Sequence, residues 1–179
     1  MRMCAPCWSN IWPAKGLEAV PFADLITAMT AAAAAGRGHD VAACFTPDGV
    51  YHDVFYGDFQ GPAAIADLIE NHFHRDAEAF RWDVHDPAET EGVGYARYTF
   101  SYRSRLAGCE GRRGAFEGVA ICRIRDGLIA DYSEIANAAT GLRMIGFDAN
   151  GLAKFIDREA AHLMARDEMA AHRDTARKD

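Results

Sequence analysis

The sequence predicts a single α+β domain in which helices pack on one face of a curved antiparallel sheet. The first observation is that the chain up to about residue 74 has helical periodicity, interrupted by one short strand. The second is that Phe80 to Ala136 consists of strand-like segments joined by turns, which is typical of an antiparallel meander. The third is size, because 179 residues, 50% of them hydrophobic, suit one domain with one core.

Three helices are expected before the meander. The first runs from Pro21 to Ala35, because proline suits the first turn, the alanine run favours helix, and Gly36 suits the exit. A short second helix runs from about His39 to Phe45. The third runs from Pro62 to His74, where apolar residues recur at three- and four-residue spacing.

Five strands are expected, one before the third helix and four after it. They are Val50–Phe55, Phe80–Ala88, Gly92–Arg105, Ala115–Ile124 and Leu128–Ala136. Residues 46–49 are interpreted as a turn before the first strand, and residues 125–127 as a tight hairpin turn between the last two. Three helices on one face of such a sheet must enclose a space if the sheet bends, so we expect a pocket.

The chain divides into three parts. Residues 1–20 are expected to form an irregular N-terminal extension, residues 21–150 the domain, and residues 151–179 a charged helical tail. Cys4 and Cys7, in the extension, have the spacing of a redox pair or of half a zinc site. Their position in the first seven residues, without two further ligands at close spacing, argues against both roles.

The composition excludes several classes of function. A formal net charge of -7 gives a surface that repels phosphate backbones, so we expect no nucleic acid partner. No apolar run approaches the roughly 18 residues of a membrane span. The N-terminus has no signal-peptide pattern, so we expect no membrane partner and a cytoplasmic location. Neither an H-x-x-x-H motif nor a His/Cys cluster occurs, and we expect no metal and no cofactor.

Three segments resemble the nuclear transport factor 2-like superfamily, in particular its SnoaL-like branch. AACFTPDGVYHDVF resembles that family's passage from helix to first strand, GPAAIADLIENHF its third helix, and ICRIRDGLIADYSEIAN its terminal hairpin. The resemblance covers about residues 22–147 and implies a cystatin-like fold with three helices and a cone-shaped pocket. Members include isomerases, cyclases, dehydratases, epoxide hydrolases and proteins that only bind partners, so the fold does not select an activity.

Asp53 is the first candidate for a catalytic residue. The strand period of two places Tyr51 and Phe55 on its face, so an inward-facing Asp53 is a carboxylate among aromatic rings. Burial raises a carboxylate's pKa and makes it a useful base near neutral pH. The alternative is a strand-end carboxylate that bonds a loop or pairs with an arginine.

The resemblance places Asp53 at the position of the catalytic base of ketosteroid isomerases. The family's oxyanion-binding tyrosine corresponds to Met29 and its protonated aspartate to a position near Ala120. Because both donors are missing, a dienolate would not be stabilised in that way, and we do not expect steroid isomerisation by that mechanism.

Glu134 is the second candidate for a catalytic residue. By resemblance it occupies the strand position of the water-activating aspartate of limonene-epoxide hydrolases, with Tyr132 as the aromatic residue two positions earlier. Those enzymes also use an Arg-x-Asp pair, where this chain has Arg97-Tyr98-Thr99 and lacks the aspartate. The alternative is that Glu134 faces solvent and Ile135 faces the core.

Further residues are candidates for substrate binding: Tyr51, Phe55, His74, Arg97 and Tyr132. A histidine near the end of the third helix could reach the pocket mouth, although a surface or interface position is the commoner outcome. An aromatic stripe at residues 98, 100 and 102 is more often core than binding surface. Small residues at 118, 120 and 122 could leave room for a ligand or allow sheet curvature.

These observations lead to two hypotheses for function. The first is a cofactor-free acid–base enzyme of the cyclase, dehydratase, isomerase or epoxide hydrolase type, acting on a small apolar metabolite through Asp53 and Glu134. The second is a non-catalytic small-molecule-binding or dimeric accessory protein of the same fold. In either case we expect a homodimer formed through the convex face of the sheet, where Val119 and Ile121 need to be covered.

Overall fold

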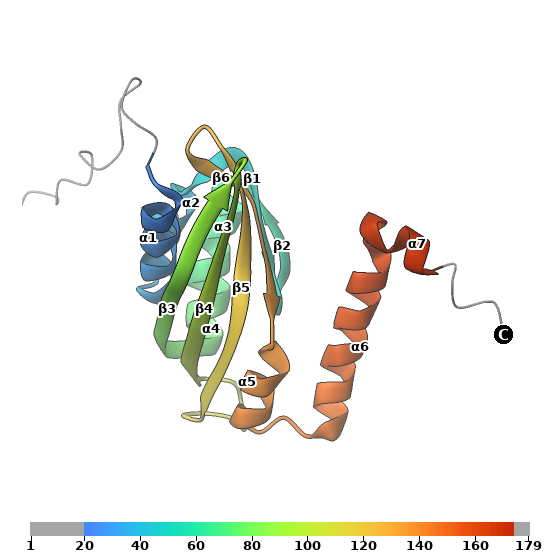
Figure 1. Cartoon of the computed structure of the whole chain (residues 1–179). Helices are drawn as coiled ribbons and strands as arrows, with labels where there is room; N and C mark the ends of the chain where they lie inside the picture. The colour runs from blue at the N-terminus through green and yellow to red at the C-terminus, as the bar shows by residue number, and fades with distance from the viewer. Residues whose placement is uncertain (1–19, 174–179) are drawn as a thin grey trace, which may run out of the picture.

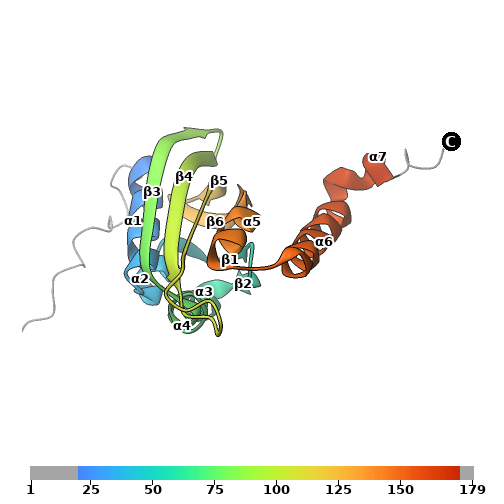
Figure 2. The same cartoon turned by 90° about the horizontal axis from the view of Figure 1, so that it is seen from below.

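The computed structural model describes residues 20–173 and shows a curved, unclosed sheet with helices packed on its concave face (Figures 1 and 2). The strands are β1 (Phe45–Asp53), β2 (Gly57–Gln60), β3 (Ala77–Thr90), β4 (Val93–Ser104), β5 (Arg113–Arg125) and β6 (Leu128–Ala136). They lie in the order β2-β1-β6-β5-β4-β3. The predicted α+β class with a curved sheet is therefore confirmed.

The helices lie at three places along the chain. Before and after the first hairpin are α1 (Phe22–Ala34), α2 (Gly38–Ala42), α3 (Gly61–Asp67), the π-helical segment η1 (Leu68–Phe73) and α4 (His74–Asp76). After the sheet come α5 (Ala138–Ile145), α6 (Ala149–Ala165), the 3-10 turn η2 (Asp167–Met169) and α7 (Ala170–Arg173). No helix within residues 20–173 is both long enough and apolar enough to cross a membrane.

The pairing of β1 with β6 differs from the expected antiparallel sheet. The meander β3-β4-β5-β6 is antiparallel, as predicted, but β1 runs parallel to β6, with Tyr51 opposite Tyr132. Helices and the four strands β2 to β5 separate β1 from β6 in sequence, so no short turn forces an antiparallel pair. Because β1 and β6 run in the same direction, the residue two positions after Tyr51 and the residue two positions after Tyr132 lie at the same end of the sheet.

Local backbone features bend the sheet. The register between β3 and β4 shifts between Glu78 and Arg81 and again between His85 and Ala88, and Ala79 and Asp86 within these shifts have φ of 50° and 52°. Bulges of this kind bend a strand and increase its twist. At the predicted β5–β6 turn, Asp126 and Gly127 have φ of 54° and 76°, as a tight two-residue hairpin requires.

Two local expectations are corrected. Residues 46–49 were expected to be a turn before the first strand, but they lie inside β1, where the register with β6 is interrupted between Phe45 and Val50. The short strand β2 is not predicted, because its four residues begin with Gly57 and are followed by Gly61, and these glycines indicate only turns. It pairs with β1 and completes the edge of the sheet.

The core fills the space between the helices and the upper part of the concave face. Leu25, Ile26 and Met29 of α1 are buried, as are Ile65 of α3 and Leu68, Ile69 and Phe73 of η1. Each such side chain contributes about 1.5–3 kcal/mol by leaving water. This core occupies one end of the cone, and the other end, next to the β1–β2 turn, is left for a pocket.

The C-terminal helix α6 lies beside the sheet and not among the helices that cover its concave face (Figure 1). It begins at Ala149, where the Asp148 carboxylate accepts a hydrogen bond from the Gly151 N–H at 2.7 Å, and none of its residues is buried. The helix therefore begins two residues before the predicted start of the tail at residue 151. Residues 174–179 lie outside the described part of the chain. The predicted extension, with Cys4 and Cys7, lies outside it as well, apart from Val20.

Candidate active site

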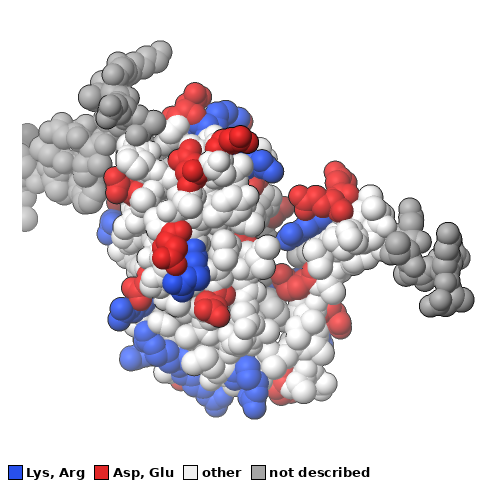
Figure 3. All heavy atoms as spheres, viewed as in Figure 1, with Lys and Arg blue, Asp and Glu red and all other residues white. Residues whose placement is uncertain are grey.

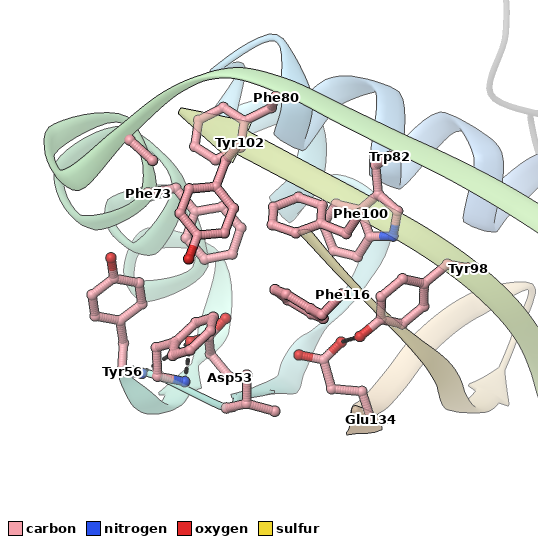
Figure 4. Close-up of a pocket in the computed structure, with 13 residues that line it drawn as sticks. Asp53, Tyr56, Phe73, Phe80, Trp82, Tyr98, Phe100, Tyr102, Phe116 and Glu134 are labelled. Atoms are coloured by element: carbon pink, nitrogen blue, oxygen red, sulfur yellow. Dashed lines mark hydrogen bonds between the residues drawn. The ribbon is translucent and has the colours of Figure 1, made fainter. Parts of the chain in front are cut away.

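An aromatic pocket opens on the concave face where β1 and β6 end (Figure 4). Its lining residues are Asp53, Val54, Phe55, Tyr56, Phe73, Ala77, Phe80, Trp82, Tyr98, Phe100, Tyr102, Phe116 and Glu134. Asp53 and Glu134 are its two carboxyl groups. The cavity measures about 50 Å³, well below the roughly 300–1,000 Å³ of ligand sites. A ligand larger than a few atoms must therefore displace part of the wall.

Asp53 is the last residue of β1, and one of its oxygens holds the loop that follows. Its Oδ1 accepts hydrogen bonds from the backbone N–H groups of Phe55 and Tyr56 at 2.8 and 2.9 Å. Its Oδ2 receives neither of these bonds. Burial raises the pKa of Asp53 to about 6, although the two N–H donors and the positive charges of Arg158 and His72 partly oppose the shift. Asp53 is therefore both a loop-holding carboxylate and a carboxylate exposed to the pocket.

Glu134 projects from β6 beside two tyrosine hydroxyls. Tyr98 Oη and Tyr132 Oη donate to the same oxygen, Oε2, at 2.5 and 3.1 Å. The other oxygen, Oε1, points away from Tyr98, toward the side of the pocket from which Asp53 projects (Figure 4). Burial, followed by the negative charge of Asp53, raises the pKa of Glu134 to about 7, against the lowering effect of its hydrogen-bond donors.

The parallel pairing of β1 and β6 is what brings these two groups together. Tyr51 and Tyr132 are opposite each other, and their rings lie 4.4 Å apart between centroids. Asp53 and Glu134 each follow two residues later, on the same face of neighbouring strands. Paired strands are about 4.8 Å apart, so both carboxyl groups reach the same small volume. One acid and one base can thus act on a single bound molecule.

Glycines of β5 make room for the tyrosines of β4. Gly118 is opposite Tyr98, and a Cβ at residue 118 would lie 2.5 Å from the Tyr98 hydroxyl oxygen. Gly114 is opposite Tyr102, and its Cβ would lie 2.7 Å from the Tyr102 ring. The space that small residues were expected to leave for a ligand is thus partly filled by tyrosines, as when an aromatic ring covers a cross-strand glycine.

The structure places the predicted substrate-binding residues in different surroundings. Phe55 lines the pocket. Tyr51 and Tyr132 lie fully buried behind the carboxyl groups, and Tyr132 contacts Glu134 rather than the open space. His52 lies on the opposite face, as the strand period predicts, between Asp58 at 2.7 Å and Asp131 at 3.1 Å.

Two predicted binding residues do not line the pocket. Arg97 lies on the convex face, where it donates to Asp86 at 3.0 Å. Because Tyr98 faces inward, the period of two turns both Arg97 and Thr99 outward, so these two residues could not form an epoxide hydrolase-like pair inside the pocket. His74 packs on the Phe80 ring and donates from Nε2 to the Ala33 carbonyl at 3.0 Å, tying α4 to α1 instead of reaching the pocket mouth.

Several pocket residues were not predicted as a site. Tyr98, Phe100 and Tyr102 are buried in the core, as an aromatic stripe predicts, and all three also line the cavity. Their alternation is visible in the sequence, but the Glu134 carboxylate that Tyr98 binds lies two strands away in the sheet, on β6, so no local signal assigns Tyr98 to the site. Trp82, also in the lining, has a buried indole N–H for which the described residues provide no hydrogen-bond acceptor.

The architecture and the site together define the class of protein. A curved, unclosed sheet with helices on its concave face and a pocket at the open end of the cone is the nuclear transport factor 2-like fold, and solved structures of that fold match this chain. A family model for the SnoaL-like domain matches residues 26–132, more than half of the 179 residues. The chain belongs to the SnoaL-like family.

Similar solved structures support the fold across most of the domain. TsrD from Streptomyces laurentii is 22% identical, with a TM-score of 0.61, covering 73% of this chain and 98% of its own. A protein with a ketosteroid isomerase-like fold from Catenulispora acidiphila is 16% identical, with a TM-score of 0.64 and coverages of 71% and 95%. An epoxide hydrolase of the LEH-like type from M. tuberculosis is 16% identical, with a TM-score of 0.54 and coverages of 77% and 93%. A search of curated proteins finds no match.

Proposed function

We propose that this chain is an acid–base enzyme that works without a cofactor on a small, largely apolar metabolite. Asp53 acts as the base and Glu134 as the acid. The observation that supports this most directly is that both carboxyl groups line one aromatic pocket and both have raised pKa values, about 6 and about 7. Near neutral pH the group with the higher pKa holds a proton to donate while the other accepts one.

The proposed step balances without any further reactant. Asp53 Oδ2 takes a proton from a carbon or oxygen of the substrate, and Glu134 Oε1 gives a proton to the oxygen or carbon where negative charge develops. The step leaves Asp53 protonated and Glu134 ionised. Proton exchange between the two groups, directly or through a water molecule, restores the starting state. Dehydration, isomerisation and cyclisation can all proceed by such a transfer. Epoxide opening uses the same two groups with water as a second reactant: Asp53 takes a proton from the water, the water oxygen attacks an epoxide carbon, and Glu134 protonates the epoxide oxygen as its carbon–oxygen bond breaks.

The lining indicates the chemistry of the substrate. Most of the wall is aromatic, which favours an apolar and flat molecule. The indole N–H of Trp82 is a buried donor in this wall, and leaving such a donor unpaired is costly. We therefore propose that Trp82 donates a hydrogen bond to a carbonyl or hydroxyl oxygen of the substrate. The substrate would carry at least one oxygen on an otherwise apolar frame.

The variant Trp82→Phe tests this contact. It keeps an aromatic ring and removes the donor, so affinity for an oxygen-bearing ligand should fall by about threefold to tenfold, the value of one hydrogen bond. Calorimetric titration with a cyclic ketone and with its hydrocarbon analogue measures the difference. Equal changes in affinity for the ketone and the hydrocarbon would show that Trp82 provides packing alone.

Substitution of the two carboxyl groups tests the acid–base mechanism. Three classes of probe substrate are suitable: a cycloalkene oxide, a β-hydroxy ketone and a β,γ-unsaturated ketone. Mass spectrometry separates gain of water, loss of water and no change in mass. Glu134→Gln and Asp53→Asn should fold and bind the probe normally but lose about 10²–10⁴ in rate, the value of a positioned acid or base.

The matched control is Glu117→Gln, which removes an exposed carboxyl group from the convex face of β5. It should keep the full rate. Full activity in Glu134→Gln would remove Glu134 from the mechanism and leave Asp53 as the only candidate base. Full activity in both variants would overturn the mechanism altogether.

A non-catalytic binding protein is the second candidate. The small cavity, about 50 Å³, and the use of Asp53 Oδ1 to hold a loop favour it. This alternative predicts that the probes bind saturably without turnover, and that neither carboxyl substitution changes more than affinity. The same titrations and mass measurements therefore separate the two candidates.

A further inference from the structure

The C-terminal helix α6 contacts the site through one arginine. The Arg158 guanidinium donates to the backbone carbonyls of Val54 and Phe55, at 2.6 and 3.1 Å. Arg158 lies 104 residues after Val54 in the chain and outside the residues 26–132 that match the SnoaL-like family model. Two bonds from a planar, permanently charged fork hold their acceptors in a defined orientation.

Arg158, from outside the pocket, and Asp53, from inside it, form hydrogen bonds to the same segment of the chain. Asp53 Oδ1 accepts the N–H groups of Phe55 and Tyr56, while Arg158 binds the carbonyls of Val54 and Phe55. Both sets of bonds constrain the same three-residue turn after β1. If the hydrogen bonds from Arg158 are lost, the turn becomes more mobile. The N–H groups that orient the Asp53 carboxylate belong to this turn, so they become more mobile as well.

Aromatic packing supports the same contact. The Phe155 ring lies 5.8 Å from the Phe55 ring between centroids, and the Arg158 guanidinium lies over Phe155 at 5.1 Å. Phe55 is a wall of the pocket. One turn of an otherwise exposed helix thus covers the outer side of the pocket wall, while the rest of α6 contributes no buried residue.

The charges around Asp53 show what Arg158 adds. Asp53 is faced by Glu134 from β6, His72 from η1 and Arg158 from α6. Arg158 also lies 3.3 Å from Glu159 of its own helix. Among these groups, Arg158 is the permanent positive charge, because its guanidinium stays protonated at all working pH values. It therefore favours the ionised form of Asp53, which is the form a base needs.

We propose that Arg158 is a positioning residue that holds the turn after β1 and keeps Asp53 oriented and ionised. This assignment rests on the proposed function, in which Asp53 is the base. It makes α6 part of the active site, although the helix lies beyond the family domain. Substitution of Arg158 should therefore change the orientation of Asp53, although no residue that touches the substrate is itself replaced.

The test measures Asp53 directly and requires no substrate. Carboxyl-¹³C NMR of the full chain gives the titration midpoint of Asp53, and amide hydrogen exchange reports on the N–H groups of Phe55 and Tyr56. Arg158→Gln removes the positive charge and the paired N–H donors of the guanidinium. It should raise the midpoint by about half a unit to one unit, and it should speed exchange at both amides by about tenfold.

Two further variants sharpen the result. Arg158→Lys keeps the positive charge and loses the paired N–H donors. The titration midpoint of Asp53 should therefore stay near that of the unsubstituted protein, while amide exchange at Phe55 and Tyr56 should still accelerate. Arg166→Gln, which removes a positive charge from the residue that follows α6, should change neither. Since the Arg158 side chain is 41% exposed, its substitution should leave the fold intact, which circular dichroism verifies.

The outcomes are separable from those of the substrate experiments. An unchanged Asp53 midpoint or unchanged exchange in Arg158→Gln overturns the proposal for Arg158, whatever the protein does with the probes. Conversely, an inactive wild-type protein with a shifted Asp53 midpoint in Arg158→Gln would count against the enzyme function while supporting this role of Arg158 on Asp53.

Discussion

At the scale of single residues, the two carboxyl groups of the pocket differ in the hydrogen-bond donors that orient them. Asp53 is oriented by backbone N–H groups, and Glu134 by the hydroxyls of Tyr98 and Tyr132. In each group one oxygen accepts both of these bonds and the other accepts neither. The bound donors fix the orientation, and burial raises both pKa values to about 6 and about 7.

The raised pKa of Glu134 also predicts how stability depends on pH. The folded protein binds this proton more tightly than the unfolded chain does, so folding is favoured where Glu134 is protonated. The free energy of unfolding should therefore fall as pH rises from about 4.5 to about 7. A shift of this size corresponds to roughly 3–4 kcal/mol at about 1.4 kcal/mol per unit.

Urea unfolding of wild type and Glu134→Gln, at a series of pH values from about 5 to about 8, measures this contribution. The amide cannot titrate, so the variant should gain stability relative to wild type as pH rises. Asp53 and His52 also have raised pKa values and change stability in the same direction, but they are present in both proteins. A difference between the two proteins that stays constant with pH would contradict the prediction.

At the scale of secondary-structure elements, β4 and β5 supply the acid with its strongest hydrogen bond. The Tyr98 hydroxyl reaches Glu134 only because residue 118, opposite Tyr98, has no side chain. The same strand pair repeats this arrangement at Tyr102 and Gly114. Strand pairing, rather than a loop, therefore sets the position of the Tyr98 donor, which is the more rigid way to hold a site.

Gly118→Ala should break this contact. Its Cβ would lie 2.5 Å from the Tyr98 hydroxyl oxygen, so the ring must shift, at a cost of about 1–3 kcal/mol in stability. Because the Tyr98 hydrogen bond lowers the pKa of Glu134, its loss should raise that pKa above about 7. Thermal unfolding and carboxyl-¹³C NMR measure the two effects.

Tyr98→Phe is the matched control for Gly118→Ala. It removes the hydroxyl without adding volume, so it should reproduce the rise in the Glu134 pKa with a smaller loss of stability. If Gly118→Ala destabilises the protein but leaves the Glu134 titration unchanged, the glycine serves only close packing of the strands.

At the scale of the whole molecule, the convex face of the sheet exposes large apolar side chains. Ile135 is 66% exposed and sits opposite Val119, while Tyr95, on the next strand, sits opposite Ile121. Figure 3 shows wide areas of this face without charge, and the charged groups between them are of both signs. Such a face is complementary to itself, so we expect a second copy of the chain to cover it.

Sedimentation velocity at micromolar concentration tests this expectation. The wild type should be a dimer, and Ile135→Glu should be a folded monomer, because it buries a charge at the centre of the proposed contact. Ile156→Glu adds the same charge to the exposed helix α6, away from the sheet, and should leave the dimer intact. A monomeric wild type would refute the homodimer.

The sequence by itself determined the elements and the faces of the strands. The four-strand meander, the Asp126-Gly127 hairpin and the shared face of Tyr51 and Asp53 follow from turn chemistry and the period of two, which are properties of a few neighbouring residues. The period did not decide whether that face points into the pocket. Periodicity left the direction of Glu134 open. The same period, counted from Tyr98, would have turned Arg97 away from the pocket.

Only the tertiary structure decided which faces meet. The parallel pairing of β1 with β6 aligns Tyr51 with Tyr132 and thereby places Asp53 beside Glu134. The contact of Arg158 with the turn after β1 crosses 104 residues of sequence. Neither is written in a local pattern, because strand partners and helix docking depend on the summed free energy of contacts between distant segments, and a motif read along the chain does not contain that sum.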